Sequence, residues 1–294
     1  MKIAVFGGSG FLGSHVADIL SISGHEVIIF DLLKSKFLKK NQKFIQGNIL
    51  NVDDIKKSML GVECVFNFIA ISNLNKSITD PIPTINVNLL GCVNLLTVCK
   101  DFKVKKYVHA STIYVGGDYG GFYKCSKYAA EEYIKEFYKI FGLKFCILRY
   151  GTLYGSRSNT DNGVYLMIKD IIKKKKIIYN GNKESQREYI NVVDAAKASI
   201  KALGKLFENK TVIITGRETT KITDLLNIIK ETLKIKRKII FKKKDFLKNS
   251  THYTRTPYSI QSEEYIMKYN SNFNIDLGQG IKKLILEIKS QKNE

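Results

Sequence analysis

Two residues with complementary chemistry, Tyr123 and Lys127, stand four positions apart in the segment YKCSK. The residues that follow, KYAAEEYIKEF, indicate a helix, on which positions i and i+4 share one face. A free tyrosine has a pKa of about 10, and a neighbouring ammonium group stabilises the phenolate and lowers that pKa. Tyr123 is therefore a candidate general base toward a hydroxyl group near neutral pH. The alternative is a chance pairing of an exposed tyrosine and lysine, because the chain is rich in both.

A glycine pattern near the start of the chain, GGSGFLG, places Gly7, Gly10 and Gly13 between an apolar strand, KIAVF, and a helix, SHVADILSISG. With the second strand HEVIIFD this forms a βαβ unit, the context that confirms a dinucleotide-binding motif. The helix N-terminus would supply N–H donors and positive potential to a pyrophosphate. Asp31 ends the second strand, where a carboxylate accepts from a ribose 2′-OH and repels a 2′-phosphate. The pattern predicts NAD rather than NADP, the alternative being a tight turn without a ligand. The positively charged nicotinamide ring of NAD would act together with Lys127 to lower the pKa of Tyr123.

The elements that must position these residues alternate along the first half of the chain. Further buried strands are predicted at 64–70, 105–111 and 143–150, with apolar helical segments between them. This alternation predicts an α/β fold, a Rossmann-type doubly wound parallel sheet. We expect residues 1–155 to form the NAD-binding domain with the catalytic residues, and residues 156–294 mainly a smaller substrate-binding lobe, interleaved with the first. KITDLLNIIKETL is a late amphipathic helix that Thr220 could cap.

Composition limits the classes of function. The chain has 294 residues and a net charge of +21, but only six of its 48 basic residues are arginine, and the lysines are scattered. Readers of nucleic acid rely on arginine and interleaved aromatic residues, so we favour a solvated lysine-rich surface, or attraction of a phosphorylated substrate, over nucleic-acid binding. Five cysteines without a CxxC pair indicate reduced thiols, a cytoplasmic location and no metal site. No secretory signal and no apolar run of about 18 residues is evident, so no membrane association is expected.

Together, the GxxGxxG spacing and the YxxxK pair resemble the extended short-chain dehydrogenase/reductase family, specifically its NAD-dependent nucleotide-sugar epimerase/dehydratase group. The resemblance implies a catalytic set of Thr112, Tyr123 and Lys127, with Ser111 as the runner-up for the hydroxyl position. Gly-Asn-Ile at 47–49 stands where the family has an acidic residue that contacts adenine, and the strand end at 67–70 lines the cofactor. The implied cofactor-binding residues are Gly7, Gly10, Phe11, Leu12, Gly13, Asp31, Asn48, Ile49, Ala70 and Lys127. The same Lys127 would orient the nicotinamide ribose.

The resemblance also places a substrate site in the second half of the chain. Arg187 in SQREYINVVDAA would bind the phosphates of a nucleotide sugar, and Thr152 replaces an asparagine that contacts substrate; Ser111 is the third candidate substrate-binding residue. Asp194 is assigned a structural role, as a possible helix cap. Val115-Gly116-Gly117 replaces Val-Tyr-Gly, and the spacing from Thr112 to Tyr123 is shorter than the family's, so the glycines are read as a compact loop rather than a phosphate cradle.

Ile113 and Tyr114 stand where family dehydratases and decarboxylases carry acids, which argues against those reactions. We therefore expect an NAD-dependent epimerase that acts at C4 of a UDP- or GDP-linked sugar through a 4-keto intermediate. A nucleotide-sugar C4 dehydrogenase or 4-keto reductase is the alternative on the same residues. A cofactor-bound RNA-binding or sensor protein is the alternative outside enzymes. The resemblance implies a homodimer that forms through the YxxxK helix.

Overall fold

The computed structural model describes residues 1–242, 252–257, 266–269 and 275–291, and its centre is one sheet of eight strands, all parallel. The strands are β1 (Lys2–Phe6), β2 (Glu26–Asp31), β3 (Gln42–Gln46), β4 (Cys64–Asn67), β5 (Lys106–Thr112), β6 (Lys144–Tyr150), β11 (Lys210–Ile214) and β14 (Ile266–Lys268). Their order, β14-β11-β6-β5-β4-β1-β2-β3, runs outward in both directions from the first strands. The predicted doubly wound parallel sheet is confirmed.

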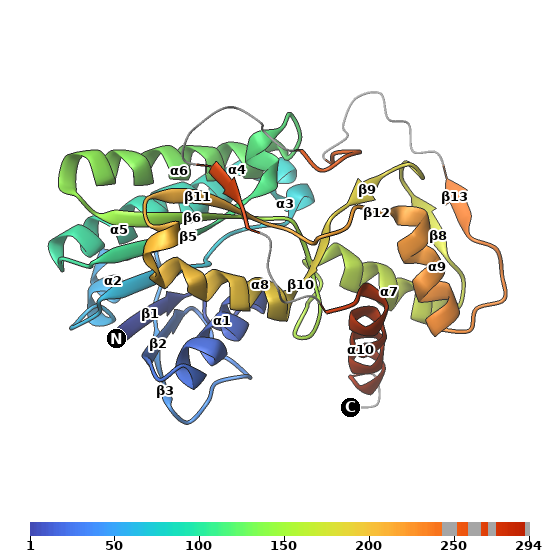
Figure 1. Cartoon of the computed structure of the whole chain (residues 1–294), viewed down its shortest axis with the longest axis horizontal. Helices are drawn as coiled ribbons and strands as arrows, with labels where there is room; N and C mark the ends of the chain where they lie inside the picture. Colours follow the sequence, from blue (N-terminus) through green and yellow to red (C-terminus); the bar gives the residue numbers. More distant parts are fainter. Residues whose placement is uncertain (243–251, 258–265, 270–274, 292–294) are drawn as a thin grey trace.

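Helices cover both faces of this sheet because its inner strands are apolar on both faces. On one face lie α1 (Phe11–Ile22) and α8 (Val192–Ser199), whose Leu20 and Ala195 join the core formed with β1 and β6. On the other lie α2 (Val52–Lys57), α5 (Gly91–Asp101) and α6 (Gly121–Phe141), which contribute Leu95 and Ala130 to a second core. Figure 1 shows α8 next to α1, and α6 on the other side of the strands from α8.

The second half of the chain builds a smaller lobe beside the carboxyl ends of the strands (Figure 1). Its core lies between α7 (Gly163–Lys174), α9 (Ile222–Thr232) and α10 (Leu277–Ser290), with Ile168, Leu225 and Leu284 at its centre. Short strand pairs border it: β7 (Thr152–Tyr154) with β10 (Tyr189–Asn191), β8 (Ile178–Asn180) with β13 (Ile240–Lys242), and β9 (Gln186–Arg187) with β12 (Thr220–Lys221). The same half also supplies β11, β14 and α8 to the sheet layer.

Two proposed helix caps are not found in the structure. Thr220 lies in β12, and α9 begins after Lys221 without a side-chain cap. Helix α8 is capped by Asn191, whose side chain accepts a hydrogen bond from the backbone N–H of Val193. Asp194 lies in the first turn of α8 instead and accepts from the backbone N–H of Ile275, 2.6 Å away. Its role is structural, as expected, but it links α8 to the segment before α10.

A long apolar helix packs on the face of the sheet that α2 and α6 also cover. It combines α4 (Pro81–Ile85), the π-helical turn η1 (Asn86–Leu90) and α5, and follows the short α3 (Leu74–Thr79). The helix Pro81–Asp101 has 21 residues, and an 18-residue window within it has a mean hydropathy of 1.5, so length and composition alone would allow it to cross a membrane. The expectation that no apolar segment reaches such a length is therefore wrong. Its buried residues, among them Leu95, Leu96 and Val98, pack in the core of this chain.

Candidate active site

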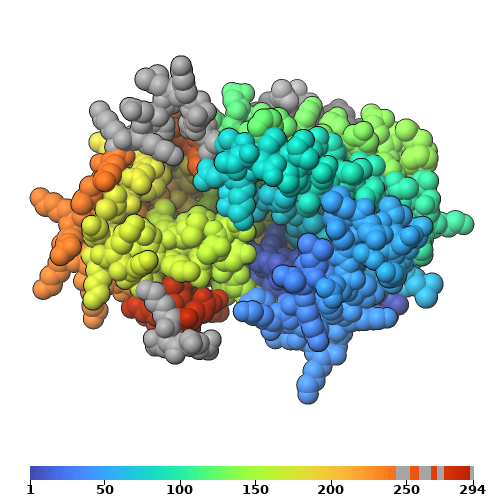
Figure 2. All heavy atoms as spheres, turned by 180° about the vertical axis from the view of Figure 1, so that it is seen from behind, coloured from blue at the N-terminus to red at the C-terminus, as the bar shows by residue number. Residues whose placement is uncertain are grey.

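A cleft of about 990 Å³ lies between the carboxyl edge of the sheet and the smaller lobe. The recess is visible in Figure 2 between the blue N-terminal segments and the yellow-green segments of the lobe. Twelve of the residues predicted from the sequence line it: Gly7, Gly10, Phe11, Leu12, Gly13, Ala70, Ser111, Thr112, Tyr123, Lys127, Thr152 and Arg187. Residues from segments far apart in the sequence thus meet in one cavity.

The glycine loop between β1 and α1 is packed too closely for side chains. Gly7 has a φ of +77°, and a Cβ atom there would lie 2.9 Å from the backbone nitrogen of Ile69. At Gly13 a Cβ atom would lie 2.2 Å from the carbonyl oxygen of Gly7. Because α1 begins directly after Gly10, its first N–H groups open onto the loop. This arrangement fits the pyrophosphate of a dinucleotide.

Asp31, at the end of β2, is tied to this loop. Its Oδ2 accepts a hydrogen bond of 3.0 Å from the backbone N–H of Ser9. Desolvation raises the pKa of Asp31, and the hydrogen bond from Ser9 lowers it in part. The carboxylate therefore lies next to the loop, as a ribose partner must, although it does not itself line the cleft.

Asn48 and Ile49 also lie outside the cleft lining. The Asn48 side chain accepts a hydrogen bond from the backbone N–H of Leu50, and Asn48 donates its own N–H to Asp54 Oδ2. Ile49 is buried against Gly91 of α5. Both residues thus make local structural contacts just after β3 and do not line the cleft that contains the glycine loop.

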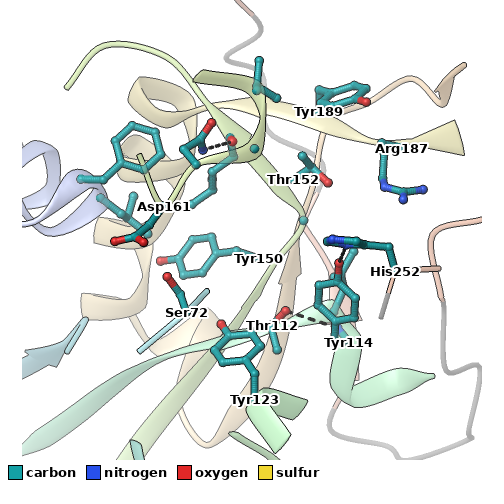
Figure 3. Close-up of a pocket in the computed structure, with 18 of the residues that line it drawn as sticks. Ser72, Thr112, Tyr114, Tyr123, Tyr150, Thr152, Asp161, Arg187, Tyr189 and His252 are labelled. Atoms are coloured by element: carbon teal, nitrogen blue, oxygen red, sulfur yellow. Dashed lines mark hydrogen bonds between the residues drawn. The ribbon is translucent and has the colours of Figure 1, made fainter. Parts of the chain in front are cut away.

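Thr112, Tyr123 and Lys127 meet where β5 and α6 approach each other at the floor of the cleft. Thr112 is the last residue of β5, and Tyr123 and Lys127 occupy the first two turns of α6. The Tyr123 hydroxyl lies close enough to Thr112 for that side chain to influence its pKa, and Lys127 Nζ donates to the carbonyl oxygen of Ala110 at 2.8 Å. Figure 3 shows Thr112 and Tyr123 side by side. The spacing read from the sequence therefore corresponds to a real convergence of side chains.

Burial dominates the electrostatics of this pair. It raises the pKa of Tyr123 to about 12, which the Thr112 side chain lowers only in part. It lowers the pKa of Lys127 to about 8, which nearby Cys92 and Glu131 raise in part. In the protein groups alone burial outweighs any effect of Lys127, so the lowering of the Tyr123 pKa expected from Lys127 together with a positively charged nicotinamide ring stays a prediction. Phenolate formation near neutral pH needs further positive charge in the cleft.

Two polar contacts fix the start of α6. Asn88 lies in the π-helical turn η1, exchanges two hydrogen bonds with the backbone of Ile71, and donates to Ser126 Oγ at 3.0 Å. Ser126 Oγ in turn donates to the carbonyl oxygen of Tyr123. Ser111, the runner-up hydroxyl, is 4% exposed and donates to Glu131 Oε1 instead. Of the two adjacent hydroxyls, Thr112 therefore carries the contact to Tyr123.

On the side of the cleft formed by the smaller lobe, Arg187 lies over an aromatic ring that the sequence left without a role. Its guanidinium is 4.2 Å from the ring centroid of Tyr253, and the Tyr253 hydroxyl is 3.3 Å from Thr152 Oγ1. Next to it, the Tyr114 hydroxyl hydrogen-bonds with His252 Nδ1 at 2.8 Å (Figure 3). Tyr114, His252 and Tyr253 thus form an aromatic wall of the cleft. The sequence analysis singled out Arg187 and Thr152 but gave this wall no role, although the sequence HYT at 252–254 stands next to Arg255. Arg255 itself does not line the cleft.

No group of three metal-ligating side chains occurs in the described ranges. The compact loop after Thr112 begins with the short helix η2 (Ile113–Gly116), and Gly120 and Gly121 both have positive φ. A Cβ atom at Gly117 would lie 2.7 Å from Pro257, so this loop packs against the segment that carries His252 and Tyr253. The glycines therefore serve close packing and a sharp entry into α6, at a distance from the first glycine loop.

Comparison with known proteins shows the family to which the sequence is similar. A profile of the NAD dependent epimerase/dehydratase family matches residues 3–215. A putative UDP-glucose 4-epimerase of Methanocaldococcus jannaschii is 32% identical over 265 residues, which cover 82% of this chain and 85% of that protein.

Solved structures share the fold over nearly the whole chain. A UDP-glucose 4-epimerase of Thermotoga maritima, solved with UDP-glucose, superposes with a TM-score of 0.85 at 24% identity over 99% of this chain and 100% of the other. A UDP-glucuronic acid 4-epimerase of Bacillus cereus, solved with UDP-glucuronic acid and NAD, gives the same score, identity and coverage. The chain belongs to the NAD-dependent epimerase/dehydratase family.

Proposed function

We propose that this chain is an NAD-dependent nucleotide-sugar epimerase that acts at C4 through a 4-keto intermediate. The observation that carries the proposal is that Thr112, Tyr123 and Lys127 converge in the same cleft as the glycine loop. In such a cleft the phenol of Tyr123, assisted by the hydroxyl of Thr112 and the amine of Lys127, can take the proton of a sugar hydroxyl. The hydride on the same carbon would pass to the dinucleotide. The family membership and the 32% identical relative support this reaction type.

The residues present fit an NAD molecule. The loop of Gly7, Gly10 and Gly13 leaves the space a side chain would fill and presents the N-terminus of α1 to a pyrophosphate. Asp31 beside the loop would accept hydrogen bonds from the adenine ribose, and Lys127 would donate to the nicotinamide ribose. When bound, NAD would supply reversible hydride acceptance. Residues 1–155 would thus hold the cofactor, and residues 156–294 would mainly hold the substrate.

The proton chemistry falls to Tyr123. Because burial raises its pKa to about 12, the phenolate forms only when positive charge stabilises it. A protonated Lys127 and the positively charged ring of bound NAD would supply that charge. Tyr123 would then take the proton of the C4 hydroxyl, with Thr112 holding that oxygen, and later return it to the 4-keto sugar. Epimerisation requires the keto sugar to turn in the cleft before the hydride returns to its other face.

Arg187 defines the nucleotide side of the substrate site. A guanidinium offers a planar set of donors that suits a diphosphate, and stacking on Tyr253 fixes its orientation. Thr152 Oγ1, hydrogen-bonded to Tyr253, contributes a further polar group to the same wall. We propose a UDP- or GDP-linked sugar as substrate; the relatives' UDP-sugars support the first base.

We further propose a homodimer in the cytoplasm. Helix α6 and the helix of α4 and α5 lie side by side. Both expose large apolar side chains, with exposed fractions of 63% for Ile82, 50% for Leu90, 51% for Tyr128 and 67% for Ile140. Pairing this face with a second copy would cover it. The five unpaired thiols support a reducing compartment.

The first experiment is mass spectrometry of the nucleotide released when the purified protein is denatured. We expect NAD or NADH at about one per chain, as for an enzyme that restores its own cofactor each cycle. UDP- and GDP-sugars would then be screened by NMR for formation of the 4-epimer, with Tyr123→Phe as the inactive control. Net formation of NADH would instead indicate a C4 dehydrogenase, and near wild-type turnover of Tyr123→Phe would contradict the assignment of the base.

A further inference from the structure

Three buried polar side chains outside the proposed catalytic set meet directly behind it. Arg149 of β6 donates to Glu131 of α6 through Nε at 3.0 Å and Nη2 at 2.6 Å, and Ser111 Oγ of β5 donates to the same carboxylate at 2.5 Å. Their exposed fractions are 4% for Ser111, 0% for Glu131 and 5% for Arg149. We call these residues the Ser111–Glu131–Arg149 cluster.

The cluster adjoins the catalytic residues along each of its three elements. Ser111 immediately precedes Thr112 on β5, and Glu131 follows Lys127 by four positions on α6, so their side chains share a helix face. Ser111 and Arg149 are register partners in the pairing of β5 with β6. The carbonyl oxygen that anchors Lys127 belongs to Ala110, the residue before Ser111. The contacts within the cluster therefore hold the parts of β5 and α6 that carry Thr112 and Lys127.

Stability alone is a poor reason for burying such a group. Removing a carboxylate and a guanidinium from water costs free energy that their attraction only roughly offsets, and apolar side chains of similar volume often stabilise a core equally well. A bidentate pair with an added hydroxyl donor does, however, specify one relative position of its elements. That geometry matters here because α6 carries Tyr123 and Lys127 while β5 carries Thr112.

We propose that Glu131, held by Arg149 and Ser111, is a positioning residue that sets α6 against the ends of β5 and β6, and thereby aligns Tyr123 and Lys127 with Thr112. The inference rests on the proposed function, in which these three groups move the C4 proton. The titratable groups that face Lys127 are Glu131 on its own helix, Cys92 on α5 and His109 on β5. Among them, Glu131 is the acidic group that favours the charged form of Lys127 at neutral pH.

The test uses the double variant Glu131→Gln/Arg149→Met, which removes both buried charges together and so avoids an unpaired one. Ser111→Ala removes a single donor and leaves the ion pair in place. The matched control is Glu136→Gln/Lys139→Met, which removes an exposed ion pair on the same helix. Two quantities are measured in each protein: kcat and KM for the nucleotide sugar, and the rate at which Lys127 is acetylated, read by peptide mass spectrometry against exposed Lys139 or, in the control, Lys135.

We expect the double variant to lower kcat by about tenfold to a hundredfold, as a displacement of about 1 Å would, with little change in KM. Lys127 should be acetylated faster than in the wild type, Ser111→Ala should shift both quantities in the same directions by less, and the control should match the wild type. An unchanged kcat or an unchanged Lys127 labelling rate in a folded double variant would overturn the proposal, even if the melting temperature fell. If the wild type turns over no nucleotide sugar, the proposed function fails, and the labelling rate alone decides this inference.

Discussion

At the scale of single residues, burial moves the acid and the base of the site in opposite directions. It raises the pKa of the Tyr123 phenol to about 12 and lowers that of the Lys127 ammonium to about 8. Both shifts disfavour the charged forms, and both charged forms are the ones that the proposed proton transfer requires. Desolvation therefore makes the phenolate and the ammonium unfavourable in the folded protein, and bound ligands of suitable charge would stabilise them.

This desolvation cost predicts an effect on stability. The folded-state pKa of Lys127, about 8, lies below its ordinary value of 10.5, so the unfolded chain binds more protons between these pH values. Stability contributed by this group therefore rises as pH increases from 8 to 10.5. We expect Lys127→Met to be more stable than the wild type at pH 7 by about 2 kcal/mol, after loss of one hydrogen bond. Urea unfolding at several pH values would show this gap closing toward pH 10.5; a gap independent of pH would contradict it.

A second prediction at this scale concerns cofactor choice. Asp31→Asn keeps an acceptor for the backbone N–H of Ser9 but removes the charge beside the glycine loop. We expect the affinity for NAD to fall about tenfold, as for loss of one charge-assisted hydrogen bond, and the affinity for NADP to rise relative to it. Calorimetric titration with both dinucleotides measures the ratio, with exposed Asp53→Asn as control. An unchanged ratio would show that Asp31 does not face the ribose.

At the scale of elements, the loop between β1 and α1 carries the sharpest packing constraint. A Cβ atom at Gly13 would lie 2.2 Å from the carbonyl oxygen of Gly7, so Gly13→Ala must displace either the loop or α1. We expect the free energy of unfolding to fall by about 2 kcal/mol and NAD binding to be lost as well. Gly163→Ala is the control, because a Cβ atom there meets nothing within 4 Å. Retention of NAD by a folded Gly13→Ala protein, judged by mass spectrometry, would be inconsistent with a pyrophosphate seat at this loop.

Elements with local signals could be predicted from the sequence, and elements with distant partners could not. The first strands, the glycine loop and the YxxxK helix each have a recognisable pattern within a few residues of sequence, and the structure brings them together at one cleft. By contrast, β11 pairs with β6 over 60 residues away, and its assignment depends on that pairing. Tyr253 gains its place only through Arg187 and Thr152, and Asp194 through Ile275. Such contacts leave no periodic pattern in the sequence, which is why the aromatic wall was missed and the Thr220 cap was wrong.

At the scale of the whole molecule, four cysteines buried in the sheet layers link stability to alkaline pH. Burial raises the pKa of Cys64 to about 12 and that of Cys92 to about 11, and it also raises the pKa values of Cys99 and Cys146. In the unfolded chain these thiols would ionise near their ordinary pKa of 9.0. Above that pH the unfolded state binds fewer protons than the folded state, so the stability present below pH 9 is lost as pH rises toward 11 and 12.

We expect each such thiol to remove about 1 kcal/mol of unfolding free energy per pH unit above pH 9, opposite in sign to the effect of Lys127. Cys64→Ala should lower stability at pH 7 through the lost packing, yet its unfolding free energy should fall less steeply between pH 9 and 10.5 than that of the wild type. Exposed Cys125 provides the control, since Cys125→Ala should leave the steepness unchanged. Urea unfolding followed by circular dichroism in the presence of reductant measures all three slopes. Parallel curves for Cys64→Ala and the wild type would mean that the buried thiols do not couple folding to pH, and that alkaline loss of stability must come from the buried tyrosines instead.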